Sequence, residues 1–148
     1  MAPLPSPHAK TVMLVEADQD DRGMYAEYLI SSGFRVIEVG DTAIALESAT
    51  AADIIVTGIH LPGPFDGLEL LRRLRKDDRT SHLPLIVLTA YVFDRERRRS
   101  VSAGCDAFLA KPCLPADLLQ TIRRVLLAGA HRRSAAHGKF IHARTNLN

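Results

Sequence analysis

Five short apolar runs alternate with five segments of helical periodicity along this chain of 148 residues. The runs cover residues 11–15, 35–39, 53–57, 83–88 and 107–110, and several are apolar at consecutive positions. Unbroken apolar runs are typical of strands covered on both faces, and strands that alternate with helices form parallel sheets. With right-handed crossovers, the pattern predicts an α/β fold, a doubly wound five-stranded parallel sheet of the flavodoxin-like order 2-1-3-4-5 with five helices.

The expected helices begin at residues suited to a helix start. Asp41 and Asp66 each precede a helical pattern as N-caps, and Pro115 opens the fifth helix at the favoured first position. The fourth helix, over residues 93–103, is the weakest of the set. Because Val101 is its main contribution to a core, we expect this helix to be loosely packed.

The composition predicts one domain between two polar ends. Residues 1–10 hold three prolines and lack the apolar core of a signal peptide, so they are expected to form a flexible leader. Residues 11–128 carry the strand and helix patterns. No apolar run approaches the length of a membrane span, and two cysteines are too few for a disulfide framework. We therefore expect a cytoplasmic protein with no membrane association and two free thiols.

The C-terminal segment 129–148 is predicted to be a basic, disordered tail. It contains four Lys or Arg residues and no Asp or Glu, which gives +4; the net charge of +2 then leaves −2 for the rest of the chain. A solvated end is one interpretation of this charge. Nucleic-acid association through the tail and the fourth helix is the alternative, although no folded nucleic-acid-binding motif accompanies the charge.

Polar motifs follow the predicted strands at the edge where their carboxyl ends meet. They read Leu-Val-Glu-Ala-Asp-Gln-Asp-Asp after the first strand, Leu-Pro-Gly-Pro-Phe-Asp-Gly-Leu-Glu-Leu-Leu after the third, Leu-Thr-Ala-Tyr after the fourth and Ala-Gly-Cys-Asp-Ala-Phe-Leu-Ala-Lys-Pro through the fifth. In order and spacing, these motifs resemble the receiver domain of two-component response regulators over about residues 11–128. The resemblance implies the same fold and a role in phosphorelay signalling.

The reactive centre departs from the family pattern at two positions. In receivers, a pair of acids after the first strand and an aspartate at the end of the third bind Mg²⁺, and that aspartate accepts a phosphoryl group from a histidine kinase. Glu16 matches the first acid, whereas Ala17 and Gly58 stand at the second acid and at the phospho-acceptor. Glycine supplies no nucleophile, and Mg²⁺ relies on carboxylates. We therefore expect a pseudo-receiver without a catalytic residue, with no cofactor and with weak or absent Mg²⁺ binding.

The rest of the pocket matches the family pattern. The resemblance makes Thr89 the switch hydroxyl, Phe108 the switch aromatic and Lys111 the lysine that contacts the phosphoryl group. Lys111 can either pair with Glu16 or form a residual anion site with Thr89. Asp18 lies one residue past the vacant metal position and is expected to be a surface or capping acid.

Two further interpretations concern the surroundings of Gly58. His60 or Asp18 could serve as a displaced phospho-acceptor, which would make the chain an active phosphorelay response regulator. The loop 61–65 is one residue longer than the usual family form, which predicts relaxed constraints around the site. No Ser/His/Asp, Cys/His or metal-ligand constellation indicates an enzyme.

An inert pocket would leave function to the surface. Receivers commonly bind partners through the face formed by the fourth helix, the fifth strand and the fifth helix. In this chain that face is predicted to present Arg95, Arg98, Arg99, Phe108, Arg123 and Arg124. We predict a stand-alone interaction module that acts without phosphorylation. Its partner is an acidic signalling protein or a second copy bound through the same face, with Asp94, Glu96 and Asp106 as counter-charges.

Overall fold

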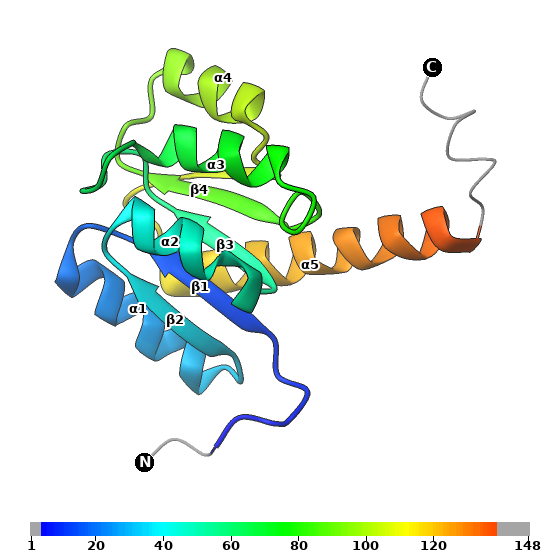
Figure 1. Ribbon diagram of the computed structural model, residues 1–148. Helices are drawn as coiled ribbons and strands as arrows, with labels where there is room; N and C mark the ends of the chain where they lie inside the picture. The colour runs from blue at the N-terminus through cyan, green and yellow to red at the C-terminus, as the bar shows by residue number, and fades with distance from the viewer. Residues whose placement is uncertain (1–3, 139–148) are drawn as a thin grey trace.

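The computed structural model describes residues 4–138 and contains one five-stranded parallel sheet of order β2-β1-β3-β4-β5 (Figure 1). The strands are β1 (Thr11–Val15), β2 (Arg35–Val39), β3 (Ile54–Thr57), β4 (Leu85–Thr89) and β5 (Ala107–Ala110). The helices are α1 (Gln19–Ser31), α2 (Thr42–Ser48), the short 3₁₀ turn η1 (Ala49–Ala51), α3 (Gly67–Lys76), α4 (Asp94–Ala103) and α5 (Pro115–Gly138). The predicted fold class and strand order are confirmed, and the third and fourth strands begin one and two residues later than predicted.

Each face of the sheet carries its own apolar core. Strand residues with one orientation, such as Leu14 and Ile86, pack under α1 and α5. Residues with the other orientation, such as Met13 and Val87, pack under α2, α3 and α4. Because the side chains of a strand alternate between faces, consecutive apolar residues in the sequence fill both cores at once.

Side chains at the helix starts fix where the helices begin. Asp41 accepts a hydrogen bond from the Ala43 amide at 2.7 Å, and Asp66 accepts one from the Glu69 amide at 2.9 Å. Both are the N-caps that the sequence predicted, and Pro115 opens α5 as expected. These caps satisfy amides that the first turn of a helix leaves without an intrahelical partner.

The fourth helix is oriented differently from the prediction. Glu96, Ser100 and Ala103 form its buried face, whereas Val101 is 61% exposed. Val101 lies one turn after Arg97 and Arg98, so the same rotation that keeps those guanidinium groups in water also turns Val101 outward. The prediction that Val101 joins the core is wrong.

The predicted boundary at residue 128 is also different in the structure. Helix α5 continues to Gly138, and its C-terminal part extends past the sheet (Figure 1). The segment 129–138 contains three alanines, which have the highest helix propensity, and no proline, so its charge does not prevent it from continuing the helix. The remainder of the predicted tail, residues 139–148, lies outside the described residues, as do residues 1–3 of the predicted leader. None of the described helices is long and apolar enough to cross a membrane.

Candidate functional site

The carboxyl ends of β1 and β3 lie side by side, and Gly58 follows directly. Val15 pairs with Thr57 in the sheet, and the Gly58 amide donates to the Val15 carbonyl at 3.0 Å. A Cβ added at Gly58 would meet its nearest neighbour, Leu61 Cδ2, at 3.6 Å, which is ordinary van der Waals contact. The backbone geometry therefore does not require glycine at this position, and there is room for a side chain.

Helix α3 begins directly against this strand end. The Gly67 amide donates to the Ile59 carbonyl at 2.8 Å, and a Cβ at Gly67 would lie 1.9 Å from the Gly58 carbonyl oxygen. Only a residue without a side chain permits this approach. Thr57 Oγ1 donates to the same carbonyl oxygen at 2.9 Å, so the backbone of Gly58 is held from two sides.

The loop between β3 and α3 is anchored, contrary to the relaxed constraints predicted from its length. Thr42 at the start of α2 donates its hydroxyl to the Phe65 carbonyl at 2.7 Å and its amide to the Pro62 carbonyl at 3.1 Å. Gly63 adopts a φ of +123°, and a Cβ there would lie 2.4 Å from Thr42 Oγ1. The additional residue is therefore accommodated by a left-handed glycine packed against α2.

Lys111 directly follows β5 and binds two carboxylates. Its ammonium group donates to Glu16, as the sequence predicted, and also to Asp21 at 2.8 Å. The side chains of Lys111 and Glu16 are only 17% and 12% exposed, whereas that of Asp21 is more open to water. Burial alone would lower the pKa of Lys111, but the hydrogen bonds that it donates to Asp21 and Glu16 outweigh this effect and raise the pKa. The ammonium group is therefore charged and paired.

Asp21 is the pocket residue that the sequence analysis missed. Asp18 takes the predicted capping role, since its carboxylate accepts the Asp21 amide at 2.9 Å, and its own amide donates to Glu16 at 3.0 Å. That cap places Asp21 in the first turn of α1, from which its side chain reaches Lys111. Ala17 is exposed between them and supplies no carboxylate.

The predicted switch residues lie close to the pocket but are held by internal contacts. Thr89 is buried, and its hydroxyl accepts the Tyr91 amide at 3.0 Å. His60 is exposed and stacks on the Tyr91 ring with centroids 4.0 Å apart. Phe108 is half-buried against the α2–α4 core, and the guanidinium carbon of Arg97 lies 4.6 Å from its ring centroid.

The predicted interaction face is basic, but most of its predicted counter-charges are already engaged. Exposed cations lie on α4 and α5 at Arg95, Arg98, Arg99, Arg123 and Arg124. Asp106 accepts from Arg75 and from the Leu85 amide, each at 2.9 Å. Glu96 is buried, with Arg95 at 3.4 Å from one of its oxygens. Of the three acids predicted as counter-charges, only Asp94 is exposed and forms no ion pair with another described side chain.

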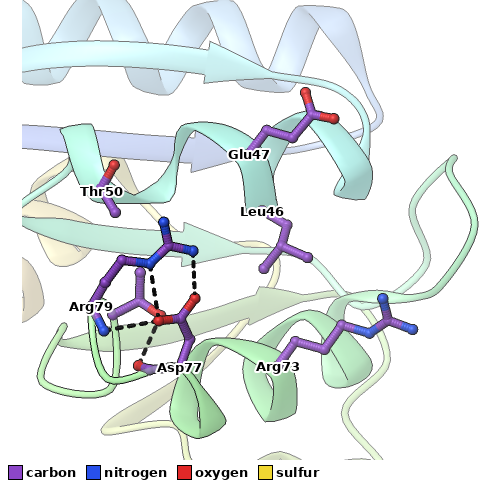
Figure 2. A pocket seen from close by; sticks show the side chains of 7 residues that line it. Leu46, Glu47, Thr50, Arg73, Asp77 and Arg79 are labelled. Carbon is purple, nitrogen blue, oxygen red and sulfur yellow. Dashed lines mark hydrogen bonds and ion pairs between the residues drawn. The ribbon is translucent and has the colours of Figure 1, made fainter.

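A separate hollow of about 310 Å³ lies between α2 and the end of α3 (Figure 2). Its charged lining residues include Asp77 and Arg79, which form two side-chain hydrogen bonds, as Figure 2 shows. The side-chain hydrogen bonds from Arg79 hold the pKa of Asp77 at about 2. No predicted site residue lines this hollow. In the described part of the chain, no three His, Cys, Asp or Glu side chains are grouped as metal ligands.

Comparison with known proteins gives the family. The model of the response regulator receiver domain matches residues 12–123. The chain belongs to this receiver family. It is 30% identical to the polar-differentiation response regulator DivK of Brucella anthropi over 119 residues, which cover 79% of this chain and 96% of that protein. It is 36% identical to the probable transcriptional regulator ycf29 of Porphyra purpurea over 117 residues, which are 78% of this chain but 56% of that relative.

Solved receiver structures show the same arrangement. A receiver domain protein from Methanospirillum hungatei superposes with a TM-score of 0.77 at 25% identity, covering 84% of this chain and 98% of that one. The receiver domain of a sensor histidine kinase from Pseudomonas aeruginosa superposes with a TM-score of 0.73 at 30% identity. The match covers 80% of this chain and 98% of that domain. That receiver was solved with a magnesium ion coordinated in its active-site cleft. The chain is thus a receiver domain of two-component signalling.

Proposed function

We propose that this receiver acts without phosphorylation, as a protein-interaction module of a two-component-type pathway in the cytoplasm. The observation that carries the proposal is Gly58 at the end of β3, the position from which receivers present their phospho-acceptor. A glycine has no side-chain atom that can form an acyl phosphate. The geometry leaves room for a side chain there, so its absence is a property of the sequence and not a demand of the backbone.

The residues around Gly58 do not suit Mg²⁺. A magnesium site in this pocket would draw on Glu16 and the two positions now held by Ala17 and Gly58, which contribute no carboxylate. Glu16 and Asp21 are both bonded to the Lys111 ammonium group. A cation would have to displace that ammonium group, and a phosphoryl donor would find the lysine already occupied. We infer that neither Mg²⁺ nor a phosphoryl group binds with useful affinity.

The proposed partner surface is the basic face of α4 and α5. Arg98 and Arg99 have no ionic partner among the described side chains, and they lie beside exposed Arg95 on α4. Unpaired surface cations of one sign steer association towards acidic proteins and set its specificity. Since Phe108 is partly covered by Arg97, the arginine side chains themselves carry the contact. This supports an acidic signalling protein as the partner.

The decisive experiment treats the protein with acetyl phosphate and Mg²⁺, and separately with beryllofluoride and Mg²⁺. We expect no phosphorylated species in the intact mass and no change in the amide NMR spectrum. The matched control is the Ala17→Asp/Gly58→Asp variant, since a Cβ at position 58 meets its nearest neighbour at ordinary van der Waals distance. This variant should gain Mg²⁺-dependent spectral changes and a phosphorylated species. Stoichiometric phosphorylation of the wild-type protein would refute the proposal, and peptide mapping would then show whether His60 or Asp18 is the acceptor.

A further inference from the structure

Helix α4 exposes its one large apolar residue and buries polar and small ones. Phe93, which immediately precedes α4, is 72% exposed, and Val101 is 61% exposed. The buried positions are Glu96, Ser100 and Ala103, so no large apolar side chain anchors this helix. By contrast, α3 buries four leucines. An exposed apolar surface on an otherwise well-packed domain indicates a site of association.

The exposed apolar residues of α4 are surrounded by positive charge. Arg97 lies between Phe93 and Val101 at helical spacing, and Arg98 is one turn before Val101. Arg98 and Arg99 have no acidic partner among the described side chains. We define the basic α4 surface as Phe93, Arg97, Arg98, Arg99 and Val101. It would suit a surface with an apolar depression and an acidic rim.

The same chain carries such a depression beside α1. Met24, Glu27, Tyr28, Ser31 and Pro115 line a hollow of about 280 Å³ between α1 and the start of α5. A cavity of about 150 Å³ holds a benzene molecule, so this hollow has room for a phenyl ring. We call this hollow the acidic α1 groove.

The rim of the acidic α1 groove is negatively charged. Asp20 and Glu27 are exposed and lie on the same side of α1 as Met24, at spacings of four and three residues. Neither has a cationic partner among the described side chains. Asp117 adds a third exposed carboxylate in the first turn of α5. The groove therefore complements the basic α4 surface in both charge and apolar character.

We propose that the basic α4 surface of one molecule docks into the acidic α1 groove of a second copy. The proposal rests on the interaction role proposed above and identifies the acidic partner as this chain itself. Because α1 and α4 cover opposite faces of the sheet, the two surfaces are different patches of one molecule. Figure 1 shows the two helices at opposite ends of the domain, with α4 at the top and α1 at the lower left. Such a head-to-tail contact does not close on itself as a two-fold dimer and instead builds rings or open chains.

The test is sedimentation velocity on the full chain at concentrations from about 10 µM to 1 mM, since a surface-to-groove contact of this size binds weakly. The weight-average mass of the wild-type protein should rise with concentration and fall at about 0.5 M NaCl, because salt screens the charges. Arg98→Glu/Arg99→Glu removes one half of the contact, and Asp20→Lys/Glu27→Lys removes the other. Each variant alone should remain monomeric, with circular dichroism confirming that it is folded.

Mixing the two variants distinguishes this head-to-tail contact from a symmetric one. Arg98→Glu/Arg99→Glu keeps the acidic α1 groove intact, and Asp20→Lys/Glu27→Lys keeps the basic α4 surface intact. The surface left in one variant therefore complements the surface left in the other. An equimolar mixture should therefore form a one-to-one heterodimer that does not grow further. Lys76→Glu and Asp78→Lys, exposed positions at the end of α3, are single charge-reversal controls of the two signs and should associate like the wild-type protein.

Three results would overturn the inference: a monomeric wild-type protein up to 1 mM, association that survives both variant pairs, or variants that stay monomeric when mixed. These outcomes leave the proposed function intact, because a receiver that acts through a different protein would still resist phosphorylation. Conversely, phosphorylation of the wild-type protein would remove the proposed function whatever its oligomeric state. The two proposals therefore fail separately.

Discussion

Replacing Lys111 by methionine tests whether the pocket is now a structural ion cluster. The Lys111 ammonium group joins β5 to Glu16 after β1 and to Asp21 on α1. Methionine preserves much of the side-chain length but leaves two neighbouring carboxylates without their cation. Removing one partner of a fully buried pair costs about 3–5 kcal/mol, whereas a surface pair contributes about 0–1 kcal/mol. The contact with Glu16 is close to the buried case, and the contact with Asp21 is half-exposed.

We therefore expect Lys111→Met to lower the free energy of unfolding by about 2 kcal/mol. For a domain of this size, that corresponds to a fall in the melting temperature of about 6–10 °C. Urea unfolding at pH 7, followed by circular dichroism, measures the first quantity and a thermal scan the second. Lys76→Met, at an exposed lysine on α3, is the matched control and should change stability by less than about 0.5 kcal/mol.

A double-mutant cycle with Glu16→Gln identifies the cause of any loss of stability in Lys111→Met. If the two side chains stabilise the fold through each other, the double variant should be more stable than the sum of the single effects by about 1 kcal/mol. Strictly additive effects would refute the ion-cluster interpretation. The pH dependence gives a second check, because the pKa of Lys111 is raised in the folded protein. The advantage of the wild-type protein over Lys111→Met should persist at neutral pH and decline only above the unfolded lysine pKa of about 10.4.

Other predictions concern Gly67 beside the site, the backbone contacts of Arg75 and a half-buried thiol. Gly67→Ala should cost about 3 kcal/mol in urea unfolding, because its Cβ would lie 1.9 Å from the Gly58 carbonyl oxygen; near-wild-type stability would contradict this geometry. Arg75→Lys should cost about 1–3 kcal/mol, because the guanidinium donates to three backbone carbonyls, including that of Gly104 at 2.7 Å; a loss below about 0.5 kcal/mol would contradict it. Burial raises the pKa of the Cys105 thiol, so iodoacetamide should label it more slowly in the folded protein than in urea at pH 7; equal rates would argue against burial.

The sheet and most helix starts could be predicted because each depends on nearby residues. Asp41 and Asp66 cap helices through bonds to amides two or three positions away, and such bonds are encoded in a few consecutive residues. The pairing of Glu16 with Lys111 spans most of the chain, but it was expected from the resemblance to receiver domains, which places both residues in the pocket where the carboxyl ends of the strands meet. These features were within reach of the sequence.

The features that were not predicted depend on two opposing local preferences, such as burial of an apolar residue against exposure of its charged neighbours. The sequence alone does not show which preference is stronger. Val101 was expected inside because it is the largest aliphatic residue of its helix, but the arginines around it dictated the orientation of that helix. In residues 129–138, the charge predicted disorder and the alanines predicted a helix, and the helix prevailed. Asp21 was not predicted in the pocket, although a cap at Asp18 places Asp21 in the first turn of α1, from which it reaches Lys111.

The bonds around the switch residues bear on how a receiver without a phospho-acceptor could still change state. In the structure, Thr89 is tied to the β4–α4 loop by one hydrogen bond, from the Tyr91 amide to its hydroxyl. A single neutral hydrogen bond contributes about 0.5–1.5 kcal/mol, a factor of roughly 2–12 in an equilibrium constant. A partner that binds the displaced loop more tightly by that free energy would break this hydrogen bond and release the loop without a covalent modification. Under the proposed function, occupancy of the α4 surface would then set the state of the domain, so the concentration of the partner would carry the signal that phosphorylation carries elsewhere in the family.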